Sequence, residues 1–406
     1  KEAYLSDHLV GYETKNLKDL SRPPELTLRA REATRGSGDR QELAVAIFPA
    51  ALTDRLPAWL RTEDEDPKKP HKKRKADLAI FEPVRHEWHY RIQPAPGFQL
   101  RELPAASQII AGGTTLEKSF AEKDGVVTAS LSLDIGRRRM TAAEAEELRE
   151  KVLAWRKADP ILIYFDHTGE KLLRAGDVKG ALAEFRRLSQ ADSKSALQRT
   201  RIARAYLAAG LGESARREAR QAVELDPKSL DAWMTLASVL EHDLLGRFRE
   251  PGLDWPGALK AWEKALELEP ENNTVRGNYA IALEYDARAQ RYSPQARLAD
   301  AIAQYRKIKP EELDKLQIGN NLGMALLRSG QFAELLEYLA TLPKLSAGGQ
   351  AQKVAALAAT KGATAALEEA SKMGLNEQTR SAVLASAGQF LLTLRLYPPA
   401  GQLIGA

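Results

Sequence analysis

Few residues of this 406-residue chain have the types and spacing that catalysis or metal binding requires. The chain has no cysteine, so a thiol nucleophile, a thiolate metal ligand and a disulfide are excluded within it. His86, Glu87 and His89 are the nearest approach to a metal site. Side chains an odd number of positions apart point to opposite faces of a strand, so His86 and His89 can share a metal ion only across a bulge. His167 and His242 are single histidines in helical stretches, where packing or surface roles are expected.

Two further patterns resemble catalytic sites only superficially. Gly112-Gly113-Thr114-Thr115 lacks the following lysine and the strand–loop–helix frame of a phosphate-binding loop, and it predicts a hairpin turn. The acidic residues near Asp300 and Glu311 flank expected helix ends, where carboxylates favour the helix dipole. No acidic pair has the contrasting environments that acid–base catalysis needs. We therefore predict no catalytic residue, no cofactor site and no metal site within this chain.

The densest charge feature is Lys68–Lys75, which carries six positive charges directly after the acidic run Glu63–Asp66. Two interpretations are a binding element for nucleic acid or acidic lipid, and a solvated loop whose charge is largely neutralised. Since 60 basic and 55 acidic side chains mostly alternate in sign along the chain, we favour the loop and predict no nucleic-acid partner. No apolar run reaches the roughly 18–20 residues of a transmembrane helix.

The N-terminal third changes from helical to strand-like periodicity. Tyr4, Leu9 and Tyr12 have roughly helical spacing, so residues 1–22 are predicted to be an entering helix or linker. Residues 23–138 then alternate with a period of two, as in Val127–Leu133, and Asp124-Gly125 predicts a hairpin. Short strands with frequent turns favour an antiparallel β-sandwich domain.

The rest of the chain is predicted to be helical. Thr141 and Glu144 have the spacing of a capping box, which would open a connecting helix within residues 139–160. Gly176 and Gly210 lie 34 residues apart in matching contexts, each at an expected turn between paired helices. We therefore predict a multidomain protein in which the β-sandwich is followed, over residues 161–406, by an all-α solenoid of helix pairs with degenerate C-terminal repeats.

Two consecutive helix pairs contain about nine extra residues each, within Leu245–Pro256 and around Arg288–Ala296. Such insertions gather on one side of a solenoid and often serve binding, although longer helices that pack against each other would also account for them. Apolar residues in or beside the insertions are Phe248, Leu253, Trp255 and Tyr292. A set of tyrosines fits either core packing or an aromatic ligand platform, namely Tyr279, Tyr285, Tyr292 and Tyr305.

With this 34-residue period, residues 162–340 resemble tetratricopeptide repeats over five units. The resemblance implies that the first helix of each pair lines a concave groove, and that a protein or peptide partner binds there. It places eight residues in that groove: Arg204, Asp231, Met234, Ser238, Thr274, Ile281, Asn320 and Met324. The set of Lys and Asn residues that grips a C-terminal carboxylate in some of these proteins is incomplete here.

Residues 1–155 resemble the β domain that follows the catalytic domain in bacterial transglutaminase-like proteins. The resemblance rests on Leu17–Pro24, Ile47-Phe48-Pro49, Glu87–Ile92 and Pro96-Gly97-Phe98. It implies that this chain is the non-catalytic C-terminal part of such a protein, because the family's Cys-His-Asp triad has no cysteine to match here. It also favours a periplasmic or envelope-associated location, with the cytoplasm as the alternative.

These observations predict a non-catalytic scaffold for protein–protein interaction, whose solenoid groove binds a protein or peptide. The alternative is the recognition or assembly tail of a larger cysteine enzyme whose catalytic domain lies upstream. A third hypothesis is a subunit of an envelope-associated complex. The first residue is Lys1 rather than methionine, so we expect a fragment or a processed product.

Overall fold

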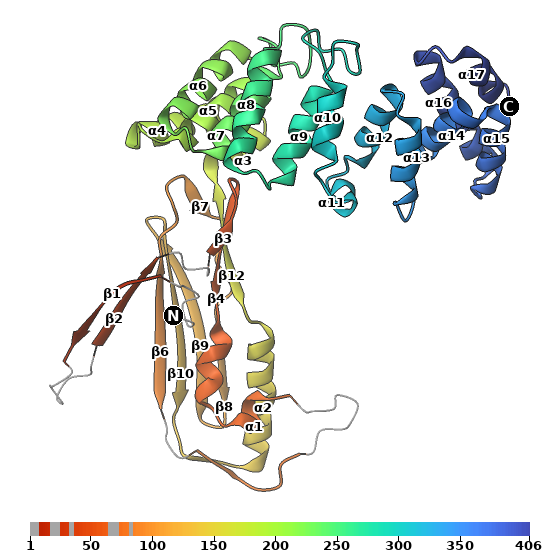
Figure 1. Ribbon diagram of the computed structural model, residues 1–406. Helices are drawn as coiled ribbons and strands as arrows, with labels where there is room; N and C mark the ends of the chain where they lie inside the picture. The colour runs from red at the N-terminus through yellow and green to blue at the C-terminus, as the bar shows by residue number, and fades with distance from the viewer. Residues whose placement is uncertain (1–7, 17–24, 32–35, 64–72, 81–83) are drawn as a thin grey trace. The chain divides into compact units, whose positions relative to one another are not determined.

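The structure is a computed structural model that describes residues 8–16, 25–31, 36–63, 73–80 and 84–406 (Figure 1). The chain forms two compact units, Lys1–Glu184 and Phe185–Ala406. Their boundary falls inside helix α4 (Val178–Ala191).

The first sheet of the N-terminal unit is antiparallel, with the order β6 (Arg85–Ile92), β10 (Val126–Ile135), β9 (Thr114–Lys123) and β8 (Ser107–Ala111). Alternate residues of β10, from Val127 to Ile135, are buried, as a strand with one face on a core requires. Gly112-Gly113 joins β8 to β9 and Asp124-Gly125 joins β9 to β10. All four turn residues have positive φ, so both predicted hairpin turns are confirmed.

The second sheet corrects the predicted start of the solenoid. Its order is β3 (Gly36–Gly38), β4 (Glu42–Ile47), β12 (Ile161–His167) and β7 (Phe98–Leu100), again antiparallel. We predicted that the solenoid begins at residue 161, and this is wrong because Ile161–His167 is a strand between β4 and β7. Ile161, Ile163 and Phe165 are buried on one side of it. A two-residue ladder joins β5 (Leu78–Ala79) to β11 (Arg139–Met140).

Helices share the core of these sheets. They are η2 (Pro49–Arg55), α1 (Ala58–Arg61) and α2 (Ala142–Lys157). Leu148 and Val152 of α2 belong to the same buried cluster as Leu131 of β10 and Ile163 of β12. The predicted connecting helix of residues 139–160 is thus part of the N-terminal core. The predicted antiparallel sheets are present, but over the described residues their core is shared with helices, and no two-sheet sandwich is shown.

The first described segment also differs from its prediction. β1 (His8–Lys15) is a strand that pairs antiparallel with β2 (Glu25–Arg31), so the helix predicted over residues 1–22 is wrong for His8–Lys15. Val10, Tyr12 and Thr14 alternate with other residues and have high strand propensity, which favours pairing over the weak helical spacing. Residues 1–7 and 17–24 lie outside the described residues.

The capping box of α2 supplies a stability prediction. The Thr141 hydroxyl accepts a hydrogen bond from the Glu144 backbone N–H (3.3 Å), and the Glu144 carboxylate accepts one from the Thr141 backbone N–H (2.8 Å). Thr141→Ala should lower the free energy of unfolding of the N-terminal unit by about 1 kcal/mol, as measured by urea titration. Glu150→Ala, at an exposed position inside α2, is the control, expected within about 0.5 kcal/mol of the parent. Equal losses for the two variants would contradict the assigned cap.

The same box makes the stability of α2 depend on pH. The hydrogen bond from the Thr141 backbone and the Arg137 guanidinium lower the pKa of Glu144 from 4.5 to about 2. Since the folded pKa is the lower one, the stabilising effect of the carboxylate is complete above pH 4.5 and is lost as the pH falls towards about 2. The Thr141 hydroxyl also donates to the Glu144 carboxylate (2.9 Å) and contributes to its lowered pKa. Thr141→Ala removes this bond, so the difference between the variant and its parent should shrink in acid.

The C-terminal unit consists of helix pairs. Over its described residues the pairs are α5 (Ala196–Ala208) with α6 (Gly212–Leu225), α7 (Leu230–Leu240) with α8 (Trp255–Leu268), α9 (Asn273–Leu283) with α10 (Leu298–Tyr305), α12 (Gly319–Arg328) with α13 (Phe332–Ala340), α14 (Ala347–Lys361) with α15 (Ala363–Lys372), and α16 (Glu377–Thr393) with α17 (Tyr397–Ile404). Short helix α11 (Pro310–Lys315) precedes α12, and α3 (Thr168–Arg174) precedes α4. One buried cluster runs through the unit from Ala203 to Leu403.

Glycines mark the turns of the pairs, and Gly176 and Gly210 do so where the sequence predicted them. Gly176, Gly210 and Gly330 have positive φ, as does Gly362 between α14 and α15. Gly388 differs from the others, since it lies inside α16 rather than at a turn. A Cβ atom there would lie 2.5 Å from Cγ1 of Ile404, so the glycine allows α17 to approach closely.

Candidate functional site

The histidines of β6 lie as the strand register predicts. Exposure alternates along the strand, so His86 and His89 are on opposite faces. On the exposed face, His89 Nδ1 lies 3.0 Å from the Ser130 hydroxyl, and His89 Nε2 lies 3.5 Å from the Glu87 carboxylate. A serine, a histidine and a carboxylate in contact are the groups that form an activated serine nucleophile. The sequence did not reveal this grouping, because Ser130 comes beside His89 only through the pairing of β10 with β6. The His89 and Glu87 side chains are 66% and 40% exposed, so this group of atoms lies on open surface.

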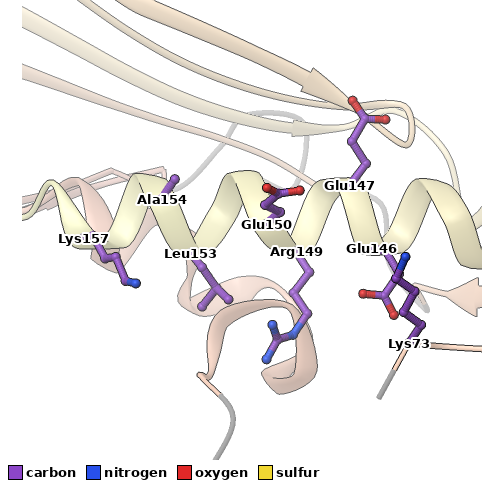
Figure 2. Close-up of a pocket in the computed structure, with 8 residues that line it drawn as sticks. All are labelled: Lys73, Glu146, Glu147, Arg149, Glu150, Leu153, Ala154 and Lys157. Atoms are coloured by element: carbon purple, nitrogen blue, oxygen red, sulfur yellow. The ribbon is translucent and has the colours of Figure 1, made fainter. Parts of the chain in front are cut away.

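A hollow of about 640 Å³ lies along α2 (Figure 2). Its lining carries three acidic and three basic side chains. Arg149 is already engaged, because its guanidinium donates to the carbonyls of Trp59 (3.0 Å) and Thr62 (2.7 Å). Figure 2 shows Glu147 on the opposite side of the helix from Arg149, so the lining groups do not converge on one ligand position.

The predicted basic loop lies mainly outside the described residues, which omit 64–72. Its described end is held against the fold. The Arg74 guanidinium lies 5.3 Å from the centre of the Trp59 ring and donates to the Ala76 carbonyl (2.8 Å).

The eight predicted groove residues lie on the first helices of four consecutive pairs. α5 carries Arg204, α7 carries Asp231, Met234 and Ser238, α9 carries Thr274 and Ile281, and α12 carries Asn320 and Met324. Their role in binding stays a prediction, but their surroundings differ in a useful way.

The exposed members of the set are three of its five polar residues. Ser238, Thr274 and Asn320 are exposed, whereas the three apolar members are half-buried against the shared core. Arg204 and Asp231 come together, at 3.7 Å, and link α5 to α7. Asn320 accepts a hydrogen bond from the Ser346 hydroxyl (3.0 Å) beside a hollow of about 220 Å³.

The two insertions are ordered loops rather than longer helices. We name Glu241–Asp254 the first loop and Glu284–Arg297 the second loop; they lie 43 residues apart and occupy the same edge of the unit (Figure 1). In each, an aspartate carboxylate accepts two backbone N–H groups of its own loop, Asp243 from Leu245 and Arg247, and Asp286 from Arg288 and Gln290. Each loop also closes with a short antiparallel bridge.

A buried glutamate anchors each loop to the second helix of its pair. Glu241 Oε2 accepts two hydrogen bonds from the Arg249 guanidinium (2.9 and 2.7 Å), and Oε1 accepts one from the Trp262 indole (2.6 Å). Glu284 does the same with Arg291 (2.8 and 2.5 Å) and the Tyr305 hydroxyl (2.7 Å). Burial raises the pKa of the Glu284 carboxyl. We name these two clusters the glutamate locks.

Alternating arginines and aromatic rings connect the loops. The Arg249 guanidinium lies 4.6 Å from the Phe248 ring and 4.3 Å from Tyr285. Arg291 lies 5.6 Å from Tyr285 and 4.7 Å from Tyr292, and Arg328 of α12 lies 5.6 Å from Tyr292. These cation–π contacts join three consecutive repeats.

The tyrosines therefore have two roles. Tyr279 and Tyr305 are buried in the core, and Tyr279 donates to Glu263 (2.6 Å), whereas Tyr285 and Tyr292 belong to the series of stacked rings and arginines. Among the apolar residues of the insertions, Leu253 and Trp255 are buried and Phe248 is exposed. The His242 ring contacts the Phe248 ring at a tilt of 48°, with the ring centres 5.0 Å apart. His167 is buried, and its Nδ1 caps α3 by accepting from the Glu170 N–H (3.4 Å).

Residues 172–240 match the tetratricopeptide repeat family, which confirms that part of the predicted resemblance. The match does not reach the segment that resembles transglutaminase-like proteins, for which no support was found. No match was found among curated proteins.

Solved structures with similar helical arrays include three of different coverage. MamA is 18% identical, with a TM-score of 0.34, and the alignment covers 51% of this chain and 92% of that chain. PilF of Pseudomonas aeruginosa is 20% identical, with a TM-score of 0.32 and coverage of 51% and 88%. The Naa15/Naa10 complex bound to HypK-THB is 18% identical, with a TM-score of 0.37 and coverage of 58% and 35%. Likenesses of this size say nothing about the partner or activity of this chain.

Within the described residues, no helix has the length and apolar character needed to span a membrane.

Proposed function

We propose that the C-terminal unit is a non-catalytic scaffold that binds an extended segment of a protein partner along its first helices. The observation that carries this proposal is the continuous core from Ala203 to Leu403, which holds consecutive first helices in a fixed array. A rigid array presents many contact points without a large ordering cost on binding. The helix-pair fold of this region supports a protein partner rather than a small-molecule substrate.

The composition of the first helices suits a segment with mixed chemistry. Exposed Ser238, Thr274 and Asn320 can exchange hydrogen bonds with a bound backbone, and the half-buried Met234 and Ile281 provide apolar contact. Partner binding by such a surface rests on a few central anchors rather than on one reactive group.

Two finer points stay predictions within this proposal. One is that the chain is the recognition tail of a larger transglutaminase-like cysteine enzyme or a subunit of an envelope-associated complex. The other is a periplasmic location. The scaffold role of the helical unit is compatible with each of them.

The groove assignment is tested by adding bulk and charge at its accessible positions. Ser238→Arg combined with Thr274→Arg should weaken binding of groove peptides about tenfold or more, because both side chains would block the surface. The probes are dodecapeptides selected on the full chain from a random display library, and affinity is measured by fluorescence anisotropy. Helical circular dichroism and the melting temperature should stay at the parent values, since both positions are exposed.

The matched control changes exposed residues of the second helices, Arg217→Ala with Lys260→Ala. It should leave peptide binding unchanged. If no selected peptide loses affinity for the groove variant, or if the control variant loses as much, the groove is not the binding surface.

A further inference from the structure

The loop edge of the C-terminal unit carries exposed apolar side chains, of which Phe248 also contacts His242 and Arg249 of its own loop. The exposed fractions of Leu244, Leu245 and Phe248 are 51%, 65% and 55%, and that of Leu211 is 49%. Leu211 belongs to the turn of the preceding pair, and the next N–H, of Gly212, donates to the Leu244 carbonyl at 2.9 Å. The four side chains therefore come from two backbones that touch. Apolar groups that cluster on a surface in this way mark interaction sites more often than scattered ones do.

The backbone beneath the patch is rigid. Asp243 fixes the tip of the first loop through two backbone N–H groups, and Glu241 fixes its return through Arg249. Arg216 of α6 donates to the carbonyls of His242 (2.6 Å) and Gly252 (3.0 Å), which holds the loop against the preceding pair. Because the loop is already ordered, binding of a partner to its apolar side chains costs little conformational entropy of the loop.

The second loop repeats this backbone with different side chains. The positions that correspond to Leu245 and Phe248 are occupied by Arg288 and Arg291. The charge of Arg291 is neutralised by Glu284. Arg288 is exposed, and the nearby Asp286 is buried and accepts hydrogen bonds from backbone N–H groups of its own loop. The edge thus changes from apolar to basic within one repeat.

Arg328 of α12 strengthens the basic end. Its guanidinium lies against the Tyr292 ring, and among the described residues no carboxylate is within salt-bridge distance of it. Burial without an acidic neighbour lowers the pKa of this guanidinium, so a carboxylate from another molecule would be stabilising there. Arg288 and Arg328 therefore offer positive charge next to an apolar patch.

We propose that this loop edge, made of Leu211, Leu244, Leu245, Phe248, Arg288 and Arg328, binds an extended protein segment with large apolar residues at one end and Asp or Glu at the other. The apolar residues lie on the first loop, and the carboxylates pair with Arg288 and Arg328. Neighbouring repeats are about 10 Å apart and an extended chain advances about 3.3 Å per residue, so the acidic residues follow or precede the apolar ones by about three to six positions. This surface is separate from the first-helix groove, and binding there goes beyond the function proposed above.

The test uses the full chain and a display library of random dodecapeptides. Selection should enrich peptides that combine large apolar residues with Asp or Glu at this spacing. Their affinity, measured by fluorescence anisotropy, should fall about tenfold or more for Leu245→Ser with Phe248→Ser, and for Arg328→Gln. The loss for Arg328→Gln should be larger at low salt than at high salt.

A matched control distinguishes the loop edge from exposed leucines in general. Leu225→Ser with Leu268→Ser changes leucines at the ends of α6 and α8, where the second helices finish, and should leave affinity unchanged. Melting curves of all variants establish that they fold. The groove variant Ser238→Arg with Thr274→Arg should keep its affinity for loop-edge peptides. The loop-edge proposal and the groove proposal can therefore fail independently of each other.

Several outcomes would overturn the loop-edge proposal. These are the absence of enriched peptides, enrichment of basic sequences, and equal affinity for the parent and the loop-edge variants. Patch-dependent binding to vesicles of phosphatidylcholine and phosphatidylglycerol, without peptide binding, would assign the edge to a membrane surface instead.

Discussion

Arg291→Ala should lower the free energy of unfolding of the C-terminal unit by about 3 kcal/mol. The substitution leaves the Glu284 carboxylate without the guanidinium that donates two hydrogen bonds to its Oε2, and Glu284 is fully buried. Removing one member of a buried ion pair costs about 3–5 kcal/mol, because the remaining charge stays desolvated. Arg291 itself is 35% exposed, so water weakens the pair somewhat and the lower end of that range applies.

Urea titration followed by circular dichroism measures this loss. Arg288→Ala, on the same loop but exposed and outside the glutamate lock, should change the free energy by less than about 0.5 kcal/mol. The double variant Arg291→Ala with Glu284→Gln should recover part of the loss, because the buried charge is removed with its partner. A stability of Arg291→Ala within 1 kcal/mol of the parent would show that the lock does not hold the loop.

The Glu284 lock also sets the sign of a pH effect. Burial raises the folded pKa of Glu284 above its ordinary value of 4.5, so the ionised form is the one that costs stability. That cost is present above the folded pKa, decreases as the pH falls through it, and is gone once the pH reaches 4.5. Loss of Arg291 raises the folded pKa further, and the difference between variant and parent should therefore decrease as the pH is lowered.

Gly212→Ala should cost about 2–3 kcal/mol, the second largest effect we expect. A Cβ atom at Gly212 would collide with the carbonyl oxygen of Asp243 and would lie 2.9 Å from Cα of Leu244. Both obstacles are backbone atoms of the first loop, which Asp243 and Glu241 hold in place. The substitution must therefore displace the loop from the preceding turn and break the hydrogen bond from Gly212 to Leu244.

A glycine in open space is the appropriate control. Gly401 lies inside α17 with nothing within 4 Å of its expected Cβ, so Gly401→Ala should raise stability by up to about 1 kcal/mol. Opposite signs for the two substitutions, measured by urea titration, would establish close approach as the cause. A neutral result for Gly212→Ala would contradict the tight contact between loop and turn.

Local patterns predicted much of this fold because the residues that decide them are close in sequence. The hairpin at Asp124-Gly125 needs two residues of positive φ, the cap at Thr141 needs a carboxylate three residues on, and Gly176 and Gly210 mark turns between adjacent helices. In each of these cases the deciding contact spans only a few residues.

Long-range pairing was less visible in the sequence. Ile161–His167 is a short apolar run, and such a run does not distinguish a strand from the start of a helix. Its identity depends on β4, more than 110 residues earlier, as the pairing of Ile161 with Ile47 shows. The helix predicted for His8–Lys15 failed for the same reason, since pairing with β2 decides its conformation.

The same difference between local patterns and long-range contacts applies to the candidate surfaces. The groove residues could be placed on first helices because the repeat fixes their positions, whereas the glutamate locks could not be foreseen. Glu241 and Glu284 are two among 55 acidic residues, and only tertiary packing buries them beside an arginine and an aromatic donor. Their 43-residue separation, with an aspartate two residues after each glutamate, was the available signal.

The hydrogen bonds of each glutamate lock lie within one helix pair and its loop, which makes the lengthened repeat a transferable building block. Glu241, Arg249 and Trp262 come from one helix pair and its loop, and Glu284, Arg291 and Tyr305 come from the next. A consensus of these two 43-residue modules can thus be concatenated into longer synthetic arrays, in which the contact of Arg249 with Tyr285 of the next module is repeated at each junction. The loop side chains are apolar in one module and basic in the other. In such an array they would be chosen separately for each module, so that one edge binds a partner segment of a chosen sequence.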